Sequence, residues 1–171
     1  PVPYVMARTP MNLQSIKLRL KSQSIFFSEA LIGGRPAVIG YEKKFKWQWF
    51  ATQLNTFVVA IDFGDEPVDV AAIEAALSES FTYATRNHTG WPRGLQSGVG
   101  VICFLISSRI DALAIDYCRE LKVGKKWAGF AVPVVIDSST AAVHQFHSNP
   151  VWGLIYFPYF RELIGRLLIV S

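Results

Sequence analysis

The chain has 171 residues, of which 51% are hydrophobic and 18% charged, and its formal net charge is +4. This length suits one domain, which can bury about 70% of its unfolded surface without a metal or disulfide to staple the fold. No run of about 18 apolar residues is present, which excludes a membrane-spanning helix from the prediction. Low charge combined with high apolar content favours association with a second copy or a protein partner.

The first residues, Pro1 to Met6, lack the charged and apolar regions of a signal peptide. Cys103 lies in an apolar run and Cys118 in a predicted helix, so we interpret both as buried thiols and expect neither a disulfide nor a metal pair. These features favour a reducing, cytoplasmic location.

Charge is distributed unevenly along the chain. Residues 1–50 hold eight cationic side chains and two carboxylates, a net charge of +6, whereas residues 62–79 hold six carboxylates and no cation. The two blocks are expected to face different partners or each other.

The first predicted elements are strands. Residues 16–21 alternate between apolar and basic side chains, which is typical of a half-buried strand. Residues 25–32 and 36–49 flank the Gly33-Gly34 pair, which suits the turn of a hairpin. Residues 56–63 are almost continuously apolar, as in a central strand covered on both faces.

Helices and strands then alternate. Apolar residues at helical spacing over 70–84 predict a helix, with carboxylates at its start and Arg86 and His88 at its end. The remaining elements are expected to be a buried strand over 99–106, a helix over 108–121, strands over 130–136 and 141–146, and a helix over 152–168 that Pro158 kinks or restarts.

We therefore predict one α/β (α+β) domain over residues 1–171, with residues 1–14 as a candidate extended N-terminal arm. Its mixed sheet is expected to contain about six to seven strands, with an N-terminal hairpin and three helices.

The first candidate site is a strip over residues 43–50, where cations and large aromatics interleave. Single-stranded nucleic acid is bound by aromatic platforms beside cations, and a strip of this kind could provide both. The alternative is an amphipathic strand whose aromatics enter the core. The residues proposed for nucleic acid or another anion are Lys17, Arg19, Lys21, Lys44, Lys46, Trp47 and Trp49, with Arg93 from the Gly-rich loop over 88–98.

The second candidate is a crevice where two predicted strands end and helices begin. If these strands are parallel neighbours, carboxylates face hydroxyls there and could hold an anion or a Mg²⁺-bridged ligand. Helix capping explains the same residues without a ligand. The crevice residues are Asp62, Asp65, Ser107, Ser108 and Arg109.

A third pattern places Glu42 and Lys44 two residues apart late in a strand, with Glu29 on the preceding strand. This arrangement loosely resembles the core of restriction-endonuclease-like folds, a family that usually has Asp where Glu29 stands. The resemblance implies Mg²⁺-dependent phosphodiester hydrolysis, with Glu29, Glu42 and Lys44 as candidate catalytic residues.

The C-terminal helix is apolar on most of its circumference, which favours burial in the core or at a subunit contact over a membrane surface. Its candidate interface residues are Trp152, Tyr156, Tyr159 and Phe160.

No catalytic triad, metal-ligand spacing or cofactor fingerprint is visible, so we predict no cofactor and no metal and favour a protein that is not an enzyme. The leading hypothesis is a non-catalytic interaction module that associates with itself or with a protein partner. Binding of nucleic acid or another polyanion and metal-dependent hydrolysis are the alternatives.

Overall fold

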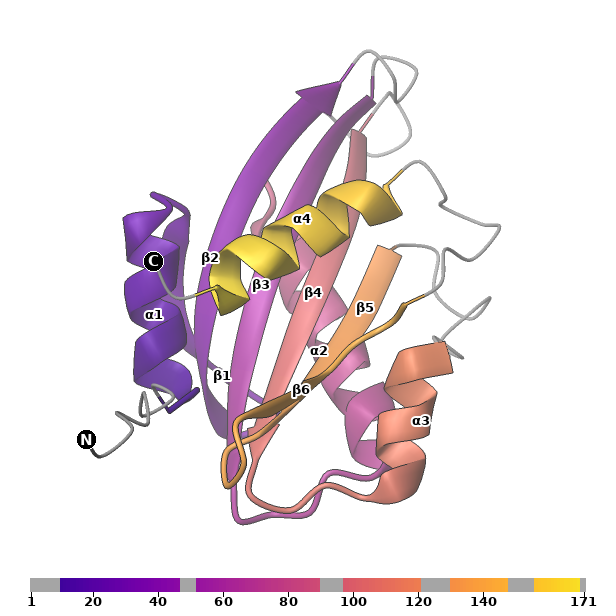
Figure 1. Cartoon of the computed structure of the whole chain (residues 1–171). Coiled ribbons are helices and arrows are strands. Elements are labelled where there is room, and N and C mark those ends of the chain that lie inside the picture. The colour runs from indigo at the N-terminus through magenta and orange to yellow at the C-terminus, as the bar shows by residue number, and fades with distance from the viewer. Residues whose placement is uncertain (1–9, 47–51, 90–96, 121–129, 148–155, 170–171) are drawn as a thin grey trace, which may run out of the picture.

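A computed structural model describes residues 10–46, 52–89, 97–120, 130–147 and 156–169. In chain order the elements are α1 (Leu13–Ser22), β1 (Phe26–Ile32), β2 (Arg35–Lys46), β3 (Thr52–Gly64), α2 (Val70–Asn87), β4 (Ser97–Ser107), α3 (Ala112–Glu120), β5 (Phe130–Asp137), β6 (Ala142–His144) and α4 (Phe157–Leu168). Helices α1 and α4 cover one face of the sheet, while α2 and α3 cover the other (Figure 1). No helix in these ranges is long and apolar enough to cross a membrane.

The strands lie in the sheet in chain order, from β1 to β6. Strands β3, β4 and β5 run parallel, and the other neighbours pair antiparallel. The parallel pairs need crossovers, which α2 and α3 provide. The predicted α/β (α+β) fold on a mixed sheet is confirmed, with six strands and four helices within the described ranges.

The predicted strand over 16–21 is wrong, because these residues belong to helix α1. Ile16 and Leu20 are buried, whereas the Leu18 side chain between them is 58% exposed. Burial at a spacing of four residues is the helical pattern, and a strand would have placed all three side chains on one face.

A capping box begins α1. The Asn12 side chain accepts a hydrogen bond from the Ser15 N–H, and the Ser15 hydroxyl accepts one from the Asn12 N–H. The helix starts at Leu13, so the last two residues of the candidate arm over 1–14 are helical.

The N-terminal hairpin is confirmed as β1 and β2 joined at Gly33 and Gly34. Both glycines have positive φ, at 60° and 76°, as a two-residue type I′ turn requires. The turn therefore fixes the register at its closing pair, Ile32 opposite Arg35.

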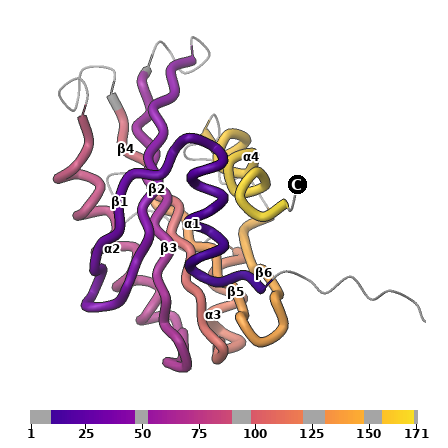
Figure 2. The backbone as a smooth tube through the Cα atoms, turned by 90° about the vertical axis from the view of Figure 1, so that its left-hand side faces the viewer, coloured from indigo at the N-terminus to yellow at the C-terminus, as the bar shows by residue number. Residues whose placement is uncertain are grey.

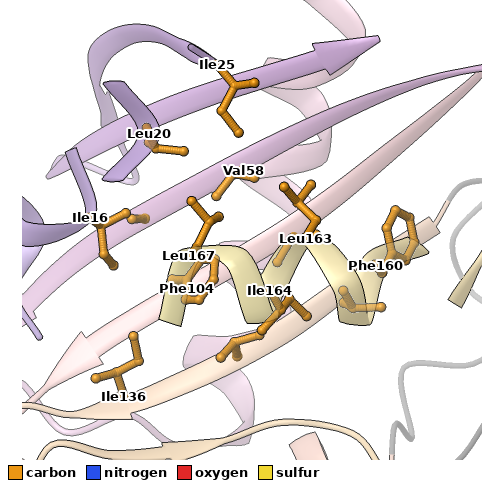
Figure 3. Close-up of a cluster of buried hydrophobic side chains, with 14 of the residues drawn as sticks. Ile16, Leu20, Ile25, Val58, Phe104, Ile136, Phe160, Leu163, Ile164 and Leu167 are labelled. Carbon is orange, nitrogen blue, oxygen red and sulfur yellow. The ribbon is translucent and has the colours of Figure 1, made fainter. Parts of the chain in front are cut away.

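The central strands are buried on both faces, as predicted for residues 56–63 and 99–106. On one face Val58 and Phe104 pack beneath the buried sides of α1 and α4 (Figure 3). On the other face Val59 and Cys103 belong to the cluster beneath α2 and α3.

Helix α4 begins at Phe157, and Pro158 lies in its first turn, where proline is tolerated. Pro158 was expected either to kink the helix or to restart it. In the described part of this segment the helix starts next to Pro158. Residues 152–155 of the predicted helix lie outside the described ranges.

Candidate functional site

The carboxyl ends of β3 and β4 are parallel neighbours, which is the condition that the predicted crevice required. The Ser108 hydroxyl donates a hydrogen bond to the Asp65 carboxylate at 2.5 Å, so a predicted carboxylate and a predicted hydroxyl do meet. Asp62 accepts a hydrogen bond from the N–H of Gly64, within its own loop.

The other polar groups at this end also hold the loops together. The Ser107 hydroxyl donates to the Glu66 carbonyl at 2.6 Å and accepts from the Arg109 N–H at 3.0 Å. The Glu66 carboxylate forms an ion pair with Arg35 at 2.6 Å. Across the described ranges, no three Asp, Glu, His or Cys side chains lie close enough to hold a metal ion. These hydrogen bonds join the loops that follow β3 and β4, whereas the cap of α2 is Asp69, which is not one of the predicted crevice residues.

Glu42 lies on the face of β2 that α4 covers, where its side chain is 15% exposed. The Arg166 guanidinium donates to Glu42 Oε2 at 2.9 Å, and the Tyr159 hydroxyl donates to the same oxygen at 2.7 Å. Burial, reinforced by the Glu42 carboxylate, raises the pKa of Tyr159 well above its ordinary value. These contacts fasten α4 to β2.

The two candidate nuclease carboxylates lie apart. Glu29 is opposite Val38, four residues before Glu42 on β2, which corresponds to roughly 13 Å along the strand. The Glu29 carboxylate pairs with Lys17, and the hydrogen bond from Lys17 together with its charge lowers the pKa of Glu29. Lys44 follows Glu42 on the same face of β2 by strand alternation.

The candidate cations of the N-terminal segment lie on helix α1, not on a strand. Lys17 and Lys21, one helical turn apart, both lie over the Phe26 ring. Arg19 points elsewhere and donates to the carbonyl of Leu167 at the end of α4. These three side chains therefore share no flat strand surface with Lys44.

The second half of the basic and aromatic strip lies partly outside the described ranges. Lys44 and Lys46 share one face of β2, and Phe45, on the other face, is 44% exposed. Trp47 and Trp49, together with Arg93 of the loop, lie outside the described residues.

The C-terminal helix packs into the core of the chain itself. Tyr159 and Phe160 are buried against the sheet, and Phe160 lies so close to Gly100 that a Cβ there would come within 2.8 Å of its ring. Their burial leaves neither ring available to a partner. Tyr156 is half-buried, and Trp152 lies outside the described residues.

Sequence reasoning missed the outer edge of strand β1, which forms one side of the sheet. Figure 2 looks onto this edge, which runs between α1 on one side and α2 on the other. The Leu31 side chain at this edge is 71% exposed. A bulge at Phe27 interrupts the register between Phe26 and Ser28, so the regular edge extends from Ser28 to Ile32.

The register shows which backbone groups of β1 point outward. The closing pair of a two-residue hairpin is hydrogen-bonded, and such pairs alternate along an antiparallel ladder. Ile32 and Ala30 therefore face β2, while the N–H and C=O groups of Leu31 and Glu29 face outward. Pro36, opposite Leu31, fits this pattern because its position needs no N–H toward β1.

Open hollows flank the edge on both faces of the sheet. On the α1 face a hollow of about 390 Å³ is lined mainly by apolar residues, among them Leu13, Leu31 and Val38. On the α2 face a hollow of about 360 Å³ is lined by Leu31 together with polar residues of α2. An added strand would send alternate side chains into these two hollows.

Comparisons with protein-family models, with curated proteins and with solved structures found no match to this chain.

Proposed function

We propose that this protein is a non-catalytic interaction module that binds an extended segment of a partner protein alongside strand β1. The observation that carries the proposal is the open edge from Ser28 to Ile32, where Glu29 and Leu31 direct four backbone hydrogen-bonding groups outward. Such an edge is a template for another strand, because main-chain hydrogen bonds bind a partner and flanking pockets select its side chains.

The contacts of the candidate carboxylates favour a binding function over a catalytic one. The candidate acidic groups are engaged in structural contacts, with Glu42 held by Arg166, Glu29 by Lys17 and Asp65 by Ser108. The outer edge of β1, in contrast, pairs with no other strand in the described part of the chain, and its Leu31 side chain is exposed. Natural proteins usually protect an edge strand of this kind against pairing with other chains, unless the edge serves to bind one.

A peptide selection against the purified protein tests this proposal. Random heptapeptides displayed on phage are selected on the wild-type chain and counter-selected on Leu31→Pro, which removes an outward N–H and leaves the ladder to β2 intact. The matched control is Leu31→Thr, which keeps the N–H and shortens the side chain. We expect enriched peptides that bind wild type and Leu31→Thr and lose more than about tenfold in affinity for Leu31→Pro. Enriched peptides that bind Leu31→Pro equally well would place the binding site elsewhere.

A second candidate function, polyanion binding, is favoured by the separation of charge along the sheet. Lys43, Lys44 and Lys46 lie where β2 ends, far along the strand from the turn that joins it to β1. The carboxylates Asp62 and Asp65 lie at the opposite end of the sheet, where β3 ends. The lysines at the end of β2 would attract the phosphate backbone of a nucleic acid.

Fluorescence anisotropy with labelled oligo(dT) tests the polyanion candidate. We expect affinity that falls steeply between about 50 and 200 mM salt, because bound phosphates release counterions. The double substitution K43Q/K44Q should weaken binding, while the charge-matched K17Q/K21Q on α1 should weaken it less. Equal losses in the two variants, or no binding at low salt, would remove this candidate.

A further inference from the structure

We infer that the segment bound beside β1 alternates apolar and charged residues, with a basic residue near the Gly33-Gly34 turn and an acidic residue farther from it. This inference rests on the proposed function, and it assigns the chemical class of the partner. The observations behind it are the different linings of the two hollows and the placement of two charges on α2.

The hollow on the α1 face selects apolar side chains. It lies between Leu13 of α1 and the strand residues Leu31, Pro36 and Val38. Glu29 is the charged residue among the described lining, and it already pairs with Lys17. Aliphatic side chains entering from an added strand would cover the exposed Leu31 side chain.

The hollow on the α2 face favours charged side chains of the bound segment. Glu79, Thr82, Tyr83 and Arg86 of α2 line it at helical spacings that place them on one side of the helix. Among the described residues, neither Glu79 nor Arg86 has an ion-pair partner, and both are exposed. One carboxylate and one guanidinium are therefore available to an incoming segment.

Two contacts fix the direction of this charge pair relative to β1. Glu79 lies beside Gly33, so close that an added Cβ there would collide with its carboxylate. The Tyr83 hydroxyl, one helical turn further along α2, is hydrogen-bonded at 2.9 Å to the Ser28 hydroxyl at the far end of the regular edge. Arg86 continues in that direction. Glu79 therefore marks the turn end of the edge and Arg86 the other end.

A segment that pairs antiparallel to β1 runs away from the turn. Its N-terminal part then lies near Glu79 and its C-terminal part near Arg86. The two α2 residues are roughly 10 Å apart along the helix axis, and same-face residues of a strand recur about every 7 Å. A basic residue followed two or four positions later by an acidic residue brings both charges within reach.

Two blocked, fluorescein-labelled heptapeptides of identical composition test the inference. The matching peptide is Val-Lys-Val-Thr-Val-Glu-Val, and the exchanged peptide is Val-Glu-Val-Thr-Val-Lys-Val. We expect the wild-type chain to bind the matching peptide roughly threefold to tenfold more tightly at low salt, because exposed ion pairs contribute modestly and are screened by salt. The double variant E79R/R86E should reverse this preference, and the single variant E79Q, which replaces the carboxylate with a neutral amide, should reduce it.

The outcomes separate this inference from the proposed function. If both peptides bind equally and Leu31→Pro abolishes both, the charge inference is wrong and edge binding stands. If both bind and Leu31→Pro has no effect, edge binding itself is wrong. If the protein alone forms a dimer that Leu31→Pro dissociates, the edge is occupied by a second copy, which overturns the peptide as its occupant.

Discussion

Glu42 illustrates how a residue that resembles a catalytic carboxylate serves the fold. Its carboxylate accepts from both Tyr159 and Arg166, so it joins the sheet to the last helix across more than a hundred residues of sequence. The spacing of Glu42 and Lys44 is visible in the sequence, but the partners of Glu42 depend on the packing of α4. A local pattern carries no information about such a distant contact.

We predict that Glu42→Ala lowers the free energy of unfolding by about 1–3 kcal/mol, because Arg166 and the Tyr159 hydroxyl lose their shared acceptor. Urea denaturation followed by circular dichroism measures this change. The matched control is Glu29→Ala, which should leave the transition unchanged because the Glu29 side chain is 60% exposed and exposed ion pairs contribute little. Equal effects of the two substitutions would contradict the structural role of Glu42.

Burial raises the pKa of the Cys103 and Cys118 thiols to about 12. Between about pH 9 and 12 the unfolded chain releases thiol protons that the folded chain retains, so stability falls as pH rises. We predict a loss of about 1.4 kcal/mol per pH unit for each thiol in this range. Unfolding titrations under reducing conditions should show a shallower loss for Cys118→Ala, and an unchanged pH dependence would show that Cys118 ionises freely in the fold.

At the scale of elements, helix α1 shows why alternation alone can mislead. The strict alternation of residues 16–21 is compatible with a strand, but the spacing of Ile16 and Leu20 is equally compatible with a helix. The exposure of Leu18 distinguishes the two, because a strand would bury it beside Ile16 and Leu20. The Asn12–Ser15 capping box is a local helix signal that the alternation obscured. The helix buries Ile16 and Leu20 against β2 and β3 and leaves Leu18 exposed.

Alanine substitutions in α1 distinguish the helix from a strand. Leu20→Ala should cost about 2–5 kcal/mol of unfolding free energy, because its side chain is fully buried. Leu18→Ala should change stability by no more than about 0.5 kcal/mol, because Leu18 lies on the solvent side. Thermal or urea unfolding measures both. Comparable losses would indicate that both side chains point into the core.

Most other elements were predictable because their signals are local. The Gly33-Gly34 turn, the continuous apolar run of 56–63 and the apolar stripe of 70–84 each specify one structure. The pairing of Asp65 with Ser108 was expected only if two strands proved to be neighbours. The open edge of β1 could not be predicted, because its exposure depends on the strand order.

For the whole molecule, charge varies along the strands of the sheet, and exposure varies across the sheet from strand to strand. Along the strands, lysines gather where β2 ends and carboxylates where β3 ends. Across the strands, the edge of β1 pairs with no further strand among the described residues, and Leu31 is exposed there between two hollows. The two candidate functions therefore use different regions of the molecule, and their tests are independent.

Amide hydrogen exchange of β1, followed by NMR, tests edge binding most directly. We predict that the outward N–H groups of Glu29 and Leu31 exchange faster than that of Ala30 in the free protein. Saturation with the Val-Lys-Val-Thr-Val-Glu-Val peptide should slow Glu29 and Leu31 and leave Ala30 unchanged. Protection of Glu29 and Leu31 equal to that of Ala30 in the free protein, or no slowing at saturation, would contradict the account.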